Sequence, residues 1–166
     1  MKPNQASVTA ENNALLKAHE CMLPAHHRIC SDPYAICFLP ERFQCAADRS
    51  RQIKETVANW DAFFPGVGNA IIARTRFIDN CLKEAIHAGM RQLVILGAGY
   101  DTRAIRFKDL LEGVTVFELD HPTTQQTKME RINTFITMDL SHVRFIPIDF
   151  SAEAFNEKLL GRGKGG

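Results

Sequence analysis

Two glycines and an acid are the residues of this sequence whose types and spacing point most directly to chemistry. Gly97-Ala98-Gly99 directly follows a short apolar run at residues 93–96, and Asp120 ends a second apolar run roughly 20 residues later. Glycine lets the backbone turn sharply and approach a ligand closely. An acid at the tip of the second strand holds ribose hydroxyls in nucleotide-binding α/β folds. The spacing predicts a nucleoside-cofactor site, and an ordinary βαβ unit with a tight glycine turn is the alternative.

The third glycine of the dinucleotide fingerprint is missing, because Thr102 stands in its place. In that fingerprint the third glycine packs the helix close to the strand beside a pyrophosphate. The turn therefore suits a ligand that has a ribose and a base but no pyrophosphate. S-adenosylmethionine fits this description, and a nucleotide-dependent oxidoreductase with an abbreviated glycine loop is the weaker alternative.

Three strands and two helices are expected to position these residues. The run at 93–96 is short and rich in branched residues, which is typical of a strand buried on both faces of a parallel sheet. A helix is expected over 102–111, a second strand over 114–117 that ends in Glu118-Leu119-Asp120, and a helix after Pro122. A third strand follows over 142–148 and ends in Asp149-Phe150.

The N-terminal part is helical in pattern. Helices are expected from Thr9 to Pro24, over 49–60 and over 70–88, the last with an apolar face. The bulky neighbours Trp60, Phe63 and Phe64 are expected in a core or lining a pocket.

The stretches LGAGYDTRAIRF and VFELDHPTTQQTK closely resemble the leucine carboxyl methyltransferase family and its bacterial and archaeal O-methyltransferase relatives. The resemblance is strong over residues 71–150 and weaker over 9–39. The positions in register with the family pattern are Gly97, Gly99, Asp101, Thr102, Arg103, Arg106, Glu118, Asp120, Pro122 and Lys128.

This resemblance implies the N-terminal part of a Rossmann-like class I methyltransferase fold, with a helical cap and about three parallel strands with helices. The cap would span residues 1–69 and the S-adenosylmethionine-binding half-domain residues 70–166. The cofactor-binding residues expected from pattern and resemblance together are Lys17, Arg74, Gly97, Ala98, Gly99, Asp101, Glu118, Asp120, Asp149 and Phe150.

Basic residues of the cap and of the 70–88 helix are expected at the methionyl carboxylate. By resemblance Arg74 takes this role, and a guanidinium suits it because it grips a carboxylate through two parallel hydrogen bonds. The alternative is a surface arginine that pairs with Asp79 or Asp101. Lys17 is the nearest cap candidate and Arg28 the second, although a solvated lysine on a helix surface is the preferred interpretation of Lys17.

The remaining acids have two interpretations each. Asp101 suits a helix N-terminus and could also face the cofactor's ammonium group. By resemblance Asp149 contacts the adenine amino group with Phe150 against the ring, whereas a helix N-cap for residues 152–160 is the structural alternative. Arg103 and Arg106 are expected in a structural ion-pair network rather than in the binding site.

The amino-acid composition is that of a globular protein. The 166 residues are 45% hydrophobic and 23% charged, and the formal net charge is +1. A near-neutral balance argues against nucleic-acid or membrane binding through bulk charge. No apolar run approaches the ~20 residues of a membrane span, and the N-terminus lacks a secretory signal, so a cytoplasmic protein is expected. The five cysteines have no C-x-x-C spacing, so thiols and no metal site are expected.

The sequence carries the cofactor half of the family pattern and ends before a fourth strand, so we expect an incomplete sheet. The first strand is then left uncovered, and association into a homo-oligomer that completes the sheet is expected. The expected activity is transfer of a methyl group to a carboxylate or hydroxyl of a small molecule or a protein terminus. The alternative is a non-catalytic S-adenosylmethionine-binding or interaction domain, and no catalytic residue is assigned.

Overall fold

The computed structural model describes residues 7–43 and 47–162, so Cys45 lies outside the described residues. The contacts divide the chain into two compact units, one spanning Val8–His87 and the other beginning at Ala88. The predicted domain boundary between residues 69 and 70 falls within helix α3 (Val67–His87) and stays a prediction. No helix in the described ranges is both long and apolar enough to cross a membrane.

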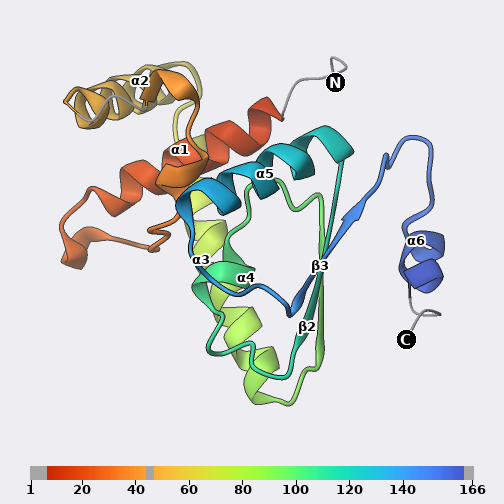
Figure 1. The fold of residues 1–166 in the computed structure, drawn as a ribbon. Coiled ribbons are helices and arrows are strands. Elements are labelled where there is room, and N and C mark those ends of the chain that lie inside the picture. Colours follow the sequence, from red (N-terminus) through yellow and green to blue (C-terminus); the bar gives the residue numbers. More distant parts are fainter. Residues whose placement is uncertain (1–6, 44–46, 163–166) are drawn as a thin grey trace. The chain divides into compact units, whose positions relative to one another are not determined.

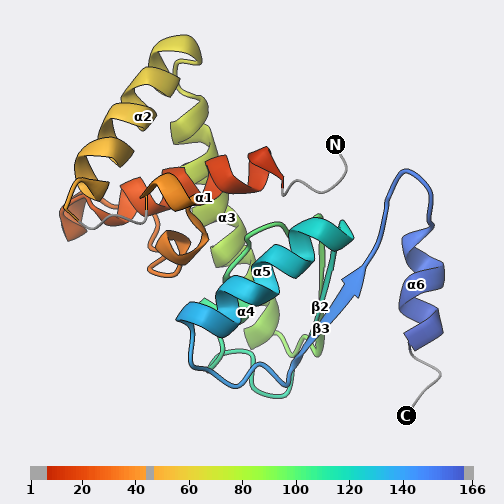
Figure 2. The ribbon, with the colours of Figure 1, turned by 45° about the horizontal axis from the view of Figure 1, so that its top comes forward.

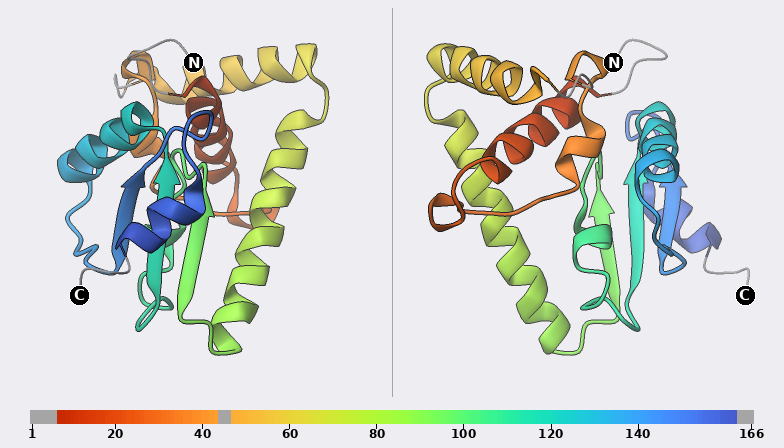
Figure 3. Two further views of the ribbon diagram at one scale, coloured as in Figure 1. Left: turned by 90° about the vertical axis from the view of Figure 1, so that its right-hand side faces the viewer. Right: turned by 60° about the vertical axis from the view of Figure 1, so that its left-hand side comes forward.

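The second unit is built on a parallel three-stranded sheet in the order β1-β2-β3 (Figure 1). The strands are β1 (Gln92–Leu96), β2 (Thr115–Asp120) and β3 (Val143–Pro147). In the register Leu96 lies beside Leu119, and Asp120 lies beside Pro147. All three strands run in one direction (Figure 3), so their carboxyl ends share one edge of the sheet. The predicted strands are confirmed.

Strand β1 is an edge strand, which corrects the expectation that both its faces are buried. It pairs only with β2 among the described strands, and Val94 and Leu96 are 42% and 51% exposed. The register puts these side chains on the same face as Phe117 and Leu119. Leu119 is fully buried because Leu159 of α6 (Phe155–Arg162) packs over that part of the face. On this face, α6 thus covers strands β2 and β3 and leaves β1 exposed.

Helices cover the two faces of this sheet. Helices α4 (Arg103–Arg106) and α5 (Pro122–Phe135) lie on one side, and α6 lies on the other (Figure 2). Helix α4 is shorter than the predicted 102–111 and is followed by hydrogen-bonded turns. Ile105 and Leu111 are both buried, yet six residues place them on different sides of a helix, so one straight helix could not bury both.

The first unit is helical. It contains α1 (Val8–Cys21), α2 (Arg49–Phe63), α3 and three short 3₁₀ turns at Ala25–His27, Ala35–Phe38 and Glu41–Phe43. Its core joins Leu16, Cys30 and Ile72, with Trp60 packed against them. A Cβ at Gly68 would lie 3.2 Å from Leu16 Cδ2, so glycine there permits close packing of α3 on α1.

The aromatic residues at the end of α2 correct another expectation. Trp60 is half-buried, but Phe63 and Phe64 are 79% and 55% exposed. Phe64 is the C-cap residue, and its ring lies edge-on to Trp60 with centroids 6.0 Å apart. The two phenylalanines, at the last position of α2 and at its C-cap, are therefore not core residues.

Candidate functional site

The glycine turn after β1 needs glycine for its backbone conformation. Gly97 and Gly99 have φ angles of +61° and +49°, a left-handed region that side chains disfavour. The Ala98 N–H donates to the Leu119 carbonyl at 3.0 Å, and the Asp101 N–H donates to the Ala98 carbonyl at 2.8 Å. A Cβ at Gly97 would meet no atom within 4 Å, so space beside the turn is open to a ligand.

Asp120 connects all three strand ends. One carboxylate oxygen accepts the Gly99 N–H, and the other accepts the His121 N–H at 2.6 Å. The Asp120 carbonyl accepts the Ile148 N–H at 2.8 Å, directly after β3. A carboxylate has about four acceptor positions, so Asp120 can hold the glycine turn and still accept hydrogen bonds from a ligand.

Glu118 points into the protein rather than to the sheet edge. It is 1% exposed and forms an ion pair with Lys128, with Nζ 2.5 Å from Oε2. Burial raises the pKa of the Glu118 carboxyl, and the nearby Lys128 charge opposes that rise. The structure therefore does not present this predicted cofactor ligand beside the glycine turn.

Asp101 caps the start of α4. Its Oδ1 accepts the Arg103 N–H at 2.7 Å, and its Oδ2 pairs with the Arg103 guanidinium. Arg106 donates to the Thr102 hydroxyl at 2.9 Å and lies over the Phe107 ring. The structural ion pair expected for Arg103 is confirmed, whereas Arg106 binds the Thr102 hydroxyl. The fully buried Thr102 thus fills the position of the missing third glycine.

Asp149 and Phe150 follow β3 at the same edge. Asp149 Oδ1 accepts the Ser151 N–H at 2.9 Å and the Ser151 hydroxyl at 2.6 Å, and these bonds lower the pKa of the Asp149 carboxyl. The N-cap alternative is wrong because α6 begins only at Phe155, and Asp149 caps an isolated turn instead. Phe150 is 47% exposed next to it.

The three basic candidates lie in the helical unit. Lys17 is 8% exposed, with Nζ 2.8 Å from the buried Asp32 carboxylate, so the interpretation as a solvated lysine is wrong. Arg28 is exposed and donates to the Leu23 carbonyl at 2.6 Å. Arg74 is exposed on α3 and forms no ion pair with Asp79, Asp101 or any other acid in the described ranges.

Lys128 is the residue that the sequence analysis did not assign to the site. Its ammonium donates to the Asp101 carbonyl at 2.6 Å as well as binding Glu118. The signal was present in the sequence, because Lys128 lies between Thr124 and Ile132 at a spacing of four on the buried side of α5. A lysine on a buried helix face requires a buried acceptor.

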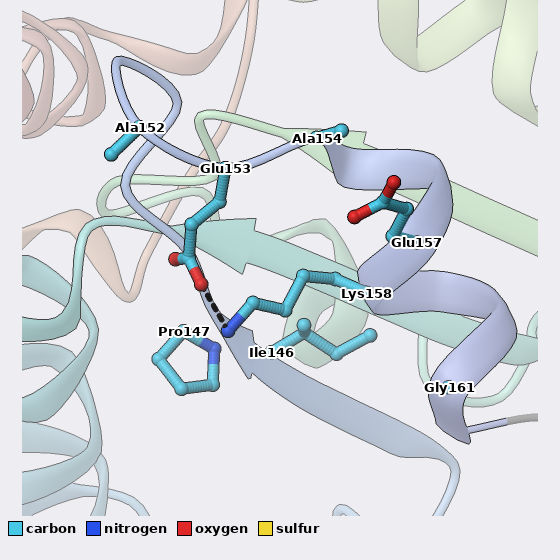
Figure 4. Close-up of a pocket in the computed structure, with 8 residues that line it drawn as sticks. All are labelled: Ile146, Pro147, Ala152, Glu153, Ala154, Glu157, Lys158 and Gly161. Carbon is cyan, nitrogen blue, oxygen red and sulfur yellow. Dashed lines mark ion pairs between the residues drawn. The ribbon is translucent and has the colours of Figure 1, made fainter.

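One cavity lies between the carboxyl end of β3 and α6. It has a volume of about 440 Å³, and Ile146, Pro147 and Lys158 are among the residues that line it. Lys158 of α6 reaches toward Glu153 with an ion-pair distance of 2.6 Å (Figure 4). None of the predicted cofactor residues lines this cavity.

The parallel sheet, the left-handed glycine turn and the acid that binds it define a Rossmann-like, nucleoside-cofactor-binding type of unit. The sequence model of the family described as leucine carboxyl methyltransferase matches residues 10–164, and the chain belongs to this family. The resemblance and the Rossmann-like fold expected from the sequence are thereby confirmed.

Two relatives are named as methyltransferases and are longer than this chain. "Putative S-adenosyl-L-methionine-dependent methyltransferase YktD" of Bacillus subtilis is 32% identical over 117 residues, which cover 70% of this chain and 38% of the relative. A second relative, "Putative S-adenosyl-L-methionine-dependent methyltransferase" of Mycolicibacterium paratuberculosis, is 32% identical over 151 residues. These residues cover 86% of this chain and 46% of the relative. The chain therefore spans less than half the length of these relatives.

Proposed function

We propose that this chain forms the cofactor-binding part of an S-adenosylmethionine-dependent O-methyltransferase. The observation that carries the proposal is the Asp120 carboxylate, which binds the Gly99 amide at the edge where all three strands end. Family membership and the names of the relatives support S-adenosylmethionine as the ligand.

The residues present fit a nucleoside without a pyrophosphate. Asp120 would accept hydrogen bonds from the ribose hydroxyls with its remaining acceptor positions. Asp149 and Phe150 would contact the adenine amino group and ring, as the family resemblance implies. Thr102 is fully buried and bonded to Arg106, so the position that glycine leaves open for a pyrophosphate is filled.

Arg74 is our candidate for the methionyl carboxylate. Its guanidinium is exposed and forms no ion pair within the described part of the chain, so no internal partner competes with a ligand. Lys17 is not retained for this role, because moving its charge to a ligand would leave Asp32 buried without its ion-pair partner. Glu118 is likewise assigned an indirect role through Lys128.

Bound S-adenosylmethionine would supply a sulfonium methyl group: the acceptor oxygen would bond to the methyl carbon as the carbon–sulfur bond breaks and S-adenosylhomocysteine leaves. The protein's part in such a reaction is to align the two reactants and exclude water. In this chain the glycine turn, Asp120 and Asp149 would fix the nucleoside. We propose a carboxylate or hydroxyl oxygen as the acceptor, on a small molecule or a protein terminus.

A non-catalytic cofactor-binding or interaction domain is the second candidate, and the exposed edge strand β1 favours an interaction role. Val94 and Leu96 lie exposed there, and β1 has one strand partner in the described sheet.

We propose that a second copy of the chain pairs at this edge. The molar mass in solution tests this, since a strict monomer would contradict association.

Cofactor binding is tested by equilibrium dialysis with methyl-labelled S-adenosylmethionine. S-adenosylhomocysteine should displace the label, and NAD⁺ should not. Asp120→Ala should reduce binding strongly, while Asp139→Ala should not, because Asp139 is exposed and its carboxylate accepts hydrogen bonds from Ser141. Displacement by NAD⁺ would instead support the oxidoreductase alternative.

Methyl transfer is tested by incubating the chain and labelled cofactor with carboxylic acids and with phenols. A product whose label is released as methanol by mild base is a methyl ester, whereas a base-stable product is an ether. Cofactor binding without transfer to any acceptor would favour the non-catalytic domain.

A further inference from the structure

Lys128 is a buried cation that the proposed cofactor contacts do not use. It is 1% exposed on α5, and its ammonium reaches both the Glu118 carboxylate of β2 and the Asp101 carbonyl. The second bond is notable because Asp101 lies 27 positions earlier in the chain, in the loop between the glycine turn and α4. One side chain thus joins a helix, a strand and the loop beside the proposed site.

The stability of the fold does not by itself require such a pair. Removing two charges from water costs several kcal/mol per ion, and well-packed apolar replacements of buried ion pairs are often neutral or stabilising. Burial already disfavours the charged form of Glu118 by raising its pKa. A role in fixing a conformation accounts for the pair better than its contribution to unfolding free energy.

The conformation in question is that of Asp101. Its N–H donates to the Ala98 carbonyl at 2.8 Å, and its carboxylate holds Arg103. Its carbonyl is bound by Lys128 at 2.6 Å. Helix α5 also contacts Glu118 through Gln125, whose side-chain amide donates to the Glu118 carbonyl at 3.1 Å. The loop at residues 99–102 is therefore anchored through Asp101 to α5 and β2.

We propose that Lys128 is a positioning residue, which holds the Asp101 carbonyl and thereby keeps the loop at residues 99–102 in its cofactor-binding conformation. This inference rests on the proposed function of the same edge. Glu118 acts through Lys128, because the carboxylate fixes where the ammonium lies.

The test compares the double variant Lys128→Met/Glu118→Gln with Ile132→Ala. The double variant removes both charges at similar volume, so it should keep its melting temperature better than Lys128→Met alone. Its affinity for S-adenosylhomocysteine should fall about tenfold or more, the loss expected for a charge-assisted hydrogen bond. Ile132 is buried one turn further along α5, so Ile132→Ala should lower the melting temperature and leave the affinity of folded protein unchanged.

Amide hydrogen exchange without cofactor gives a readout that is independent of binding. The Gly99 and Asp101 amides should exchange faster in the double variant than in wild type, and Ile132→Ala should not change them selectively. The positioning role would be overturned if the double variant is folded, exchanges its Gly99 and Asp101 amides at the wild-type rate and binds S-adenosylhomocysteine as tightly as wild type. A wild-type chain that does not bind S-adenosylhomocysteine would instead refute the proposed function, and exchange would still decide the role of Lys128.

Discussion

The Asp120 carboxylate accepts a hydrogen bond from the backbone amide of Gly99, so the end of β2 is tied directly to the turn that follows β1. The same carboxylate accepts the His121 amide, and the Asp120 carbonyl accepts the Ile148 amide. Asp120 therefore links the segments that follow all three strands. Any ligand that binds the glycine turn meets a carboxylate whose position the backbone has already fixed.

Asp120→Asn should destabilise the second unit and weaken cofactor binding together. Asparagine keeps the size but loses the charge-assisted bonds to two amides, which are worth about 1.5–3 kcal/mol for a charged acceptor. The free energy of unfolding in urea and the affinity for S-adenosylhomocysteine measure the two effects. Asp139→Asn is the matched control, and equal results for both variants would contradict the role of Asp120.

Gly97→Ala should cost stability although it fills empty space. The φ of +61° is a left-handed conformation that costs an L-residue about 1–2 kcal/mol, and no atom lies near the added Cβ. Gly161→Ala is the control, because Gly161 lies within α6 with equally open space and should gain about 0.5–1 kcal/mol. A neutral Gly97→Ala in chemical unfolding would show that the turn is not held in this conformation.

Arg74→Ala should separate binding from folding. Arg74 is exposed on α3, so its loss should change the free energy of unfolding by no more than about 0.5 kcal/mol. Affinity for S-adenosylhomocysteine should fall by about 10- to 100-fold if the guanidinium grips the carboxylate. Arg76→Ala is the control, since Arg76 donates to the Ile29 carbonyl at 3.4 Å. Unchanged affinity in Arg74→Ala would remove this residue from the site.

Lys17→Met should destabilise the helical unit severely. Asp32 is 1% exposed, and removing one partner of a buried ion pair typically costs about 3–5 kcal/mol. Lys17→Met/Asp32→Asn should recover part of that loss, because no buried charge is left behind. Thermal unfolding measures both variants. A wild-type melting temperature for Lys17→Met would show that the pair does not hold α1 to the following loop.

Because the pKa of Glu118 is raised in the folded chain, the free energy of unfolding should decrease as the pH rises. Burial raises its pKa above the ordinary value of 4.5, so the folded chain holds this proton more tightly than the unfolded chain. The resulting stability is fully present below pH 4.5 and is lost as the pH rises through the folded pKa. As the pH rises from 4.5 through the folded pKa, the free energy of unfolding of wild type should therefore decrease relative to that of Glu118→Gln. A difference that grows with pH in favour of wild type would contradict the shift.

Local patterns sufficed for the strands, the glycine turn and α5, because each is encoded by adjacent residues. The direction of Glu118 could not be predicted in this way. Glu118 and Asp120 are two positions apart and share a face of β2, so only the buried Lys128 of α5 distinguishes their roles. The α4 break and the exposure of Val94 likewise depend on which segments pack nearby. The burial of Lys17 could not be predicted for the same reason, since its partner Asp32 belongs to a turn 15 positions later in the chain.

Calorimetric titration of the folded chain with S-adenosylhomocysteine, for wild type and Asp120→Ala, tests cofactor binding at the carboxyl edge of the sheet most directly. Wild type should bind with micromolar affinity, and Asp120→Ala should lose this binding. A wild-type chain that is folded by circular dichroism but releases no binding heat would contradict this prediction, as would an Asp120→Ala variant that binds as tightly as wild type.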